Sequence, residues 1–186
     1  MIPAKGKGLE GHLKDLHKLY VIQRRAVVMK APDPVIITGR RGRKVFGVLG
    51  AAYWPDFFGY VAAGQYPVFV GGEAKECSHG IRFQLSRIDP AQAAALQRLH
   101  EDGGVAWVAI RRIHGALGRY EDHVVPHNII SMWQREGHRS VTWGDLTPWR
   151  VPPGLGWLDA VVRQREDGAQ WVWDLFCDGG WIELAS

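Results

Sequence analysis

Apolar residues recur at helical spacing near the start of the chain. Leu9, Leu13, Leu16 and Tyr20 follow one another at intervals of three or four residues, which places them on one stripe of an amphipathic helix over residues 8–23. The next run, AVVMKAPDPVIITG, has two apolar β-branched stretches around two prolines. That pattern predicts two short strands joined by a tight turn.

The middle of the chain alternates between strand and helix patterns. Residues 57–76 predict the two strands of a hairpin, with its turn near residues 64–65. The Asp-Pro pair at residues 89–90 is typical of a helix start, and the helix AQAAALQRLHED should end at the two glycines that follow it. Residues 105–113 (VAWVAIRRI) form a continuous apolar run, which indicates a central strand. These elements predict a mixed α/β layer.

The pattern weakens after about residue 130, where tryptophans are spread among prolines and glycines. We expect a core of residues 1–130 and a Trp-rich extension of residues 131–186, packed onto the core through the large apolar area of each indole. No apolar run approaches the ~20 residues that cross a bilayer, and the basic N-terminus lacks the apolar stretch of a secretory signal. The sequence therefore predicts a cytoplasmic protein with no membrane partner.

Cysteine and glycine usage exclude several kinds of site. The chain has two cysteines, which is too few for a disulfide framework or a four-cysteine zinc site. It also has no Walker-type glycine loop, so we expect no nucleotide cofactor.

Basic residues are concentrated in the first quarter of the chain. Residues 1–46 hold eleven Lys or Arg against three acidic residues, whereas the remainder holds twelve against sixteen. Such a segment favours a polyanion partner, because each cation placed on a phosphate releases counterions; solubility alone would explain it equally well. The GRRGRK segment has nothing to bury, so it predicts an exposed loop or hairpin tip. The VFGVLGAAYW run after it should return to the core.

Two acidic residues and a lysine lie near one another along the predicted hairpin. Side chains alternate along a strand, so Glu73 and Lys75 point to the same face, and Asp56 stands at the start of the neighbouring strand. Paired carboxylates are oxygen ligands for a hard cation such as Mg²⁺, which can polarise a phosphodiester and activate a water molecule. The lysine can orient that water or neutralise the pentacovalent phosphorus without occupying a metal site. Gln92, in the first turn of the next helix, should lie near the same sheet edge.

The spacing of these residues is not specific by itself. A Pro-Asp pair followed by Glu-x-Lys is frequent by chance, and taken alone it is better explained by surface carboxylates beside a solvated lysine. The apolar strand VFVGGEAK argues against that alternative, because a charge is costly to bury without a purpose.

The run from DFFGY to GGVAWVAI resembles the RecU family of Holliday junction resolvases, which are nucleases of the PD-(D/E)XK kind. The matching features are a D-x-x-G start, an E-A-K strand, the aromatic-x-L segment of Phe83 and Leu85, a glutamine-bearing helix after an isoleucine, and a Gly-Gly pair before an apolar strand. GKGLEGHLKDLHKLY also resembles the first motif of the family, and SMWQREGHRSVTWGDL is similar to its last part. The resemblance covers residues 5–146.

The resemblance implies a fold and a set of site residues. The fold would be a nuclease-like mixed central sheet flanked by helices. Asp56 and Glu73 would bind Mg²⁺, with Mn²⁺ able to substitute, and Lys75 would assist the water. Glu10 would be a further acidic ligand and Gln92 would support the cleft.

Two of these residues have ordinary alternatives. Glu10 could form a surface pair with Lys14 one helical turn away, which is worth little. Gln92 could be a plain exposed helix residue.

Family members carry a stalk that enters the open centre of the junction. In this chain the corresponding basic arm would lie near residues 36–48, and its DNA contacts would be Arg40, Arg41, Arg43 and Lys44.

The resemblance implies an endonuclease that resolves four-way branched DNA by metal-dependent hydrolysis with paired nicks. Because the junction is roughly two-fold symmetric, a homodimer would supply the two active sites. The alternatives are a repair or restriction nuclease that acts on ordinary duplex, and an architectural protein that binds junctions without cutting them.

Overall fold

The computed structural model describes residues 8–32, 35–49, 54–63, 66–78, 80–114, 119–151, 157–158, 162–164, 170–173 and 181–184. Its helices are α1 (Leu9–Ile22), α2 (Pro90–Glu101) and α3 (His127–Arg135), with 3₁₀ turns at Leu85–Arg87 and Thr147–Trp149. Its strands are β1 (Ala26–Lys30), β2 (Val35–Arg41), β3 (Lys44–Leu49), β4 (Phe57–Ala63), β5 (Tyr66–Cys77), β6 (Arg82–Gln84), β7 (Val105–His114), β8 (Arg119–Pro126), β9 (Ser140–Thr142), β10 (Val162–Gln164), β11 (Gln170–Trp173) and β12 (Trp181–Leu184).

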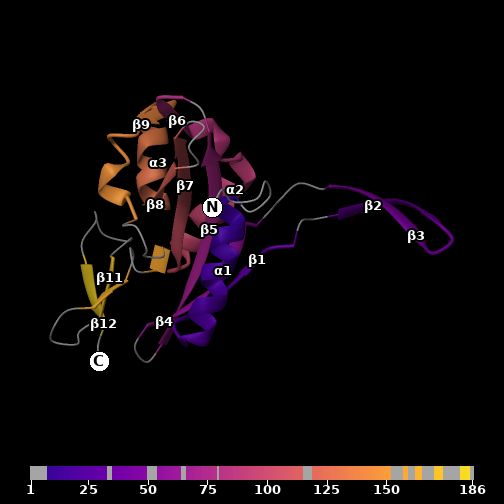
Figure 1. The fold of residues 1–186 in the computed structure, drawn as a ribbon, viewed down its shortest axis with the longest axis horizontal. Coiled ribbons are helices and arrows are strands. Elements are labelled where there is room, and N and C mark those ends of the chain that lie inside the picture. The colour runs from indigo at the N-terminus through magenta and orange to yellow at the C-terminus, as the bar shows by residue number, and fades with distance from the viewer. Residues whose placement is uncertain are drawn as a thin grey trace.

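A five-stranded mixed sheet forms the centre of the molecule (Figure 1). Its strand order is β1-β4-β5-β7-β8, in which β5 and β7 are parallel and the other neighbours are antiparallel. The parallel connection runs through α2, as a crossover between parallel strands requires. The prediction of a mixed central sheet flanked by helices is therefore confirmed.

Two hydrophobic clusters lie on opposite faces of this sheet. One contains Leu9, Leu13 and Tyr20 of α1 together with Phe57 and Trp107 from the sheet. The other contains apolar side chains of α2, α3 and the alternate positions of β7. Since β7 is buried on both faces, it reads as a continuous apolar run, and its prediction as a central strand is confirmed.

The segment after α3 also contacts the core. Trp157 is buried, stacks on Trp107 with ring centroids 4.8 Å apart, and donates its indole N–H to Nε2 of His17 at 2.8 Å. Burial lowers the pKa of His17 to about 4, which keeps the ring neutral as an acceptor. The domain boundary near residue 130 stays a prediction, and α3 spans that position.

The other helix and hairpin predictions agree closely with the structure. α1 covers all but the ends of the predicted 8–23, and the Asp89 carboxylate caps α2 by accepting the N–H of Ala91 at 2.8 Å. β4 and β5 form the predicted hairpin, whereas its expected turn at residues 64–65 lies outside the described residues. No helix in the described ranges is long and apolar enough to span a membrane.

Two predictions concern residues 26–54. The two strands expected from AVVMKAPDPVIITG are confirmed as β1 and β2, while residues 33–34 between them lie outside the described residues. β1 pairs with β4 and β2 pairs with β3. VFGV lies in β3, where Phe46 is about half exposed, and residues 50–53 of the run expected to return to the core lie outside the described residues. Short apolar runs carry no information on their partners, so these pairings are known only from the structure.

The β2–β3 hairpin projects away from the main body (Figure 1). Its turn contains Gly42, whose φ of +61° is in the left-handed region that favours glycine. The GRRGRK segment is therefore a hairpin tip, one of the two forms predicted for it.

Candidate active site

Asp56 closes the end of the β4–β5 ladder. β4 begins one residue later, where Phe57 pairs with Gly72, so the backbone of β4 provides no hydrogen-bond partner for the next residues of β5. The Asp56 carboxylate takes over this role and accepts the N–H of Ala74 at 3.0 Å, while its own N–H donates to Oε2 of Glu73 at 3.2 Å. These two bonds fix the acidic side chains of both strands beside each other.

Lys75 and Gln92 complete the group on the face covered by α2. Lys75 lies two residues after Glu73 and donates from Nζ to Oε1 of Glu73 at 2.5 Å and to Oε1 of Gln92 at 3.0 Å. Gln92 is buried in the first turn of α2. The Asp89 cap fixes that turn, so a local helix signal positions the glutamine over the end of β5.

The Glu73 carboxyl is fully buried, at 0% exposure. Burial raises the pKa of this carboxyl, the hydrogen bond from Lys75 lowers it, and the Asp56 carboxylate raises it again, with a net pKa of about 7. A carboxyl whose pKa is raised towards neutral pH by burial and by a neighbouring like charge is typical of functional sites.

The residues present fit a divalent cation. The carboxylates of Asp56 and Glu73 lie beside each other and Lys75 bonds to that of Glu73, so when both carboxylates are ionised one negative charge is left over at a site where Glu73 is buried. Mg²⁺ is commonly held by one or two carboxylates, with waters and phosphate oxygens as the other ligands. In the part of the chain that the structure describes, no group of three or more His, Cys, Asp and Glu side chains could hold a metal. The candidate within the described ranges is therefore a pair of carboxylates and not a larger cluster.

Glu10 is not brought into that pair. It is half exposed on the first turn of α1 and forms an ion pair with Lys30, with 2.6 Å between Oε2 and Nζ. The alternative partner named from the sequence, Lys14, is therefore not the observed one. The role of Glu10 as a third metal ligand stays a prediction.

Glu76 is a structural residue that sequence reasoning missed. Gly8 gives α1 no side-chain cap, and the Glu76 carboxylate accepts the N–H of Leu9 at 2.9 Å instead. A Cβ on Gly8 would lie 2.7 Å from Glu76 Oε2, so the close approach requires glycine. Because helix and cap are 67 residues apart, only the fold reveals the contact.

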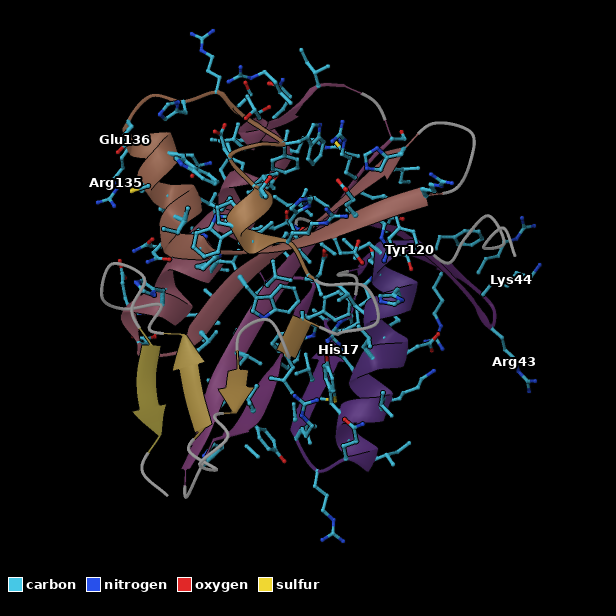
Figure 2. All side chains as sticks on the ribbon, turned by 60° about the vertical axis from the view of Figure 1, so that its left-hand side comes forward. His17, Arg43, Lys44, Tyr120, Arg135 and Glu136 are labelled. Carbon is cyan, nitrogen blue, oxygen red and sulfur yellow. The ribbon has the colours of Figure 1, made fainter. Side chains whose placement is uncertain are left out.

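The basic candidates lie at a different place from the carboxylates. Arg40, Arg41, Arg43 and Lys44 are exposed around the tip of the β2–β3 hairpin. Figure 2 shows Arg43 and Lys44 pointing outward from that tip. The structure thus groups Asp56, Glu73, Lys75 and Gln92 and separates the four basic residues from them.

The raised pKa of Glu73 predicts a pH-dependent stability. Folding raises this pKa from 4.5 to about 7, so the folded protein gains stability at low pH and loses it as the pH rises through 7. Glu73→Gln does not titrate, so between pH 5 and 8 the free energy of unfolding of the wild type should fall relative to this variant by about 1–3 kcal/mol. Urea denaturation of both proteins at pH 5 and pH 8, with EDTA present, measures these free energies of unfolding. A difference that does not change with pH would contradict it.

Comparisons with known proteins identify the family of the chain. The chain is 27% identical to the Holliday junction resolvase RecU of Leuconostoc mesenteroides subsp. mesenteroides over 87% of its length and 82% of the relative's. It is 30% identical to the protein of the same name from Shouchella clausii over 60% of its length and 55% of the relative's, and 27% identical to that of Leuconostoc citreum over 88% and 82%. Residues 4–146 match the family described as Recombination protein U, RecU. The chain therefore belongs to the RecU family.

Proposed function

We propose that this protein is a structure-selective endonuclease that resolves four-way DNA junctions by metal-dependent phosphodiester hydrolysis with paired nicks. The observation that carries the proposal is the grouping of Asp56, Glu73, Lys75 and Gln92 at the end of one hairpin, in a chain of the RecU family. Relatives named Holliday junction resolvase support the choice of substrate.

Asp56 and Glu73 would hold Mg²⁺, with Mn²⁺ able to substitute. The bound ion would supply Lewis-acid activation of the phosphodiester and of a water molecule. Glu73 must be ionised to serve as a ligand, so protons and the metal compete for this carboxylate near pH 7.

Lys75 would position the attacking water. An ammonium group has three donors, and the bonds to Glu73 and Gln92 use two of them. The third can bind a water or a phosphate oxygen, while Gln92 holds the ammonium in place. Replacing Gln92 would therefore change the orientation of Lys75 without removing a ligand.

Glu73→Gln should abolish cleavage of a four-way junction and leave junction binding intact. The amide keeps the size of the side chain but removes the negative charge that the metal needs. End-labelled junction and linear duplex of matching sequence, incubated in Mg²⁺, measure cleavage, and Glu136→Gln, which changes an exposed glutamate, is the control.

The same assay separates the alternatives. Symmetric nicks in the junction alone support the resolvase proposal. Equal cutting of both substrates would favour a general duplex nuclease, and binding without cutting in either Mg²⁺ or Mn²⁺ would favour an architectural protein. Full activity of Glu73→Gln would overturn the site assignment.

The β2–β3 hairpin would contact the junction. Its tip carries Arg40, Arg41, Arg43 and Lys44 at the far end of a projection (Figures 1 and 2). Cations on a projection can reach phosphates that converge at a branch point, whereas a straight duplex offers no such opening. Recognition would then depend on shape and phosphate contacts more than on base sequence.

Replacing these four residues by Gln should weaken junction binding more than duplex binding. The loss should be about tenfold or greater for the junction at moderate salt, and the salt dependence of binding should become shallower, because fewer counterions are released. Electrophoretic mobility shifts over a range of salt concentrations measure both. Equal losses on the two DNAs would exclude a junction-centred arm.

A homodimer would supply the second active site, and the sheet offers a surface for it. Phe58 and Tyr60 of β4 lie on the same face as Met29 of β1 and Phe69 of β5, with Trp54 beside Phe58 at a ring distance of 6.4 Å. These five side chains are 37–67% exposed. Contiguous apolar patches of this kind mark association sites. The patch is uncharged, so it can pack against its own copy across a two-fold axis.

Phe69→Asp should therefore shift the protein from dimer to monomer, because the interface would bury two unpaired charges. Light scattering after size exclusion measures the mass. Ile81→Asp, at a residue 82% exposed outside this face, is the control and should leave the mass unchanged. A monomeric wild type, or a dimer that tolerates Phe69→Asp, would contradict this interface.

A further inference from the structure

A cavity adjoins the proposed catalytic group. It has a volume of about 570 Å³ and lies between the first turns of α1 and the end of β5. Lys75 is part of its lining, together with Glu10, Lys14, Glu76 and Arg87. Whatever fills this cavity therefore lies directly next to the residue that would position the attacking water.

The charges of this cavity do not all have partners of opposite sign. Glu10 is paired with Lys30, and the Glu76 carboxylate is bound to the N–H of Leu9. Lys75 is paired with Glu73. Among the residues that the structure describes, no carboxylate forms an ion pair with Lys14 or Arg87. Two cations therefore face the cavity without compensation, which favours an anionic occupant.

Arg87 is fixed in place without being neutralised. Its Nη1 donates to Sγ of Cys77 and its Nη2 to the backbone carbonyl of Glu76, each at 2.7 Å. Neither acceptor is a carboxylate, and a guanidinium has five N–H donors, so further donors are available. A rigid guanidinium with free donors is suited to bind a phosphate group.

The N-terminus of α1 offers an anion fewer free backbone N–H donors than its position beside the cavity suggests. Helix N-termini bind phosphates through free backbone N–H groups. Here the N–H of Leu9 is already taken by Glu76. The side chains of Lys14 and Arg87 supply the positive charge for an anion in this cavity.

Arg87 and Lys75 would act on different phosphates. Arg87 is anchored at Glu76 and Cys77, one and two residues beyond Lys75 on β5. Strand residues advance about 3.3 Å each, so its anchor lies roughly 3–7 Å farther along the strand. A DNA strand that places one phosphate at Asp56 and Glu73 can continue along this line into the cavity.

We propose that this cavity binds the phosphate adjacent to the scissile one, with Arg87 and Lys14 as positioning residues for the cleaved strand. The inference rests on the proposed nuclease function and names how its site holds the substrate. The two residues hold the strand in register with the catalytic group and take no part in bond cleavage.

Neutralised phosphates test this assignment. Junctions carrying a single methylphosphonate at each position flanking the cleaved bond are compared with unmodified junction, using wild type, Arg87→Gln and Lys14→Gln. At one flanking position the modification should raise the wild-type KM about tenfold and change single-turnover kcat less than twofold. Arg87→Gln should already have a raised KM for the unmodified junction. The same modification should raise the KM of this variant little further, because the substitution and the modification remove the same contact.

Arg98→Gln is the matched control, since this exposed arginine is paired with Asp102 on α2 and lies outside the cavity lining. It should behave as the wild type with every substrate. The proposal would be overturned if the increases in KM caused by Arg87→Gln and by the methylphosphonate multiplied at every flanking position. It would also be overturned if Arg87→Gln had the same KM for unmodified junction as Arg98→Gln. If circular dichroism shows that Arg87→Gln does not fold, Lys14→Gln, at an exposed position of α1, decides by the same criterion. A wild type that cuts no junction would instead refute the proposed function.

Discussion

The burial of an ionisable carboxyl, that of Glu73, is the constraint on which the site depends. A buried charge is costly unless it is hydrogen-bonded and paired. Glu73 meets this requirement through the N–H of Asp56 and the ammonium of Lys75, which come from different strand positions. The register of β4 against β5 cannot slip by one residue without separating these groups. The site and the hairpin therefore stabilise a single arrangement together.

The two helices next to the site are held by polar contacts with the same strand end. Gln92 ties the first turn of α2 to Lys75, and Glu76 ties the first turn of α1 to β5. Both contacts lie within three residues of Glu73 along β5. A change at this strand end would therefore disturb both helix starts, and substitutions there should be judged by stability as well as by activity.

Much of this could be predicted from the sequence because the signals are local. The apolar stripe of α1, the Asp89 cap and the alternation along β5 each act over a few residues, and they place Glu73, Lys75 and Gln92 on one side. What could not be predicted depends on distant partners. The pairing of β2 with β3, the Glu10–Lys30 ion pair and the Glu76 cap all join residues whose proximity follows from the completed sheet.

We propose that Asp56 and Glu73 form a divalent metal site. Calorimetric titration of Mn²⁺ into the wild type, Asp56→Asn and Glu73→Gln at pH 8 tests it without DNA or catalysis. Mn²⁺ should bind saturably to the wild type, and this binding should be lost in both variants while both remain folded. Equal Mn²⁺ affinity in all three proteins would contradict it, because no metal ligand would then reside in this pair.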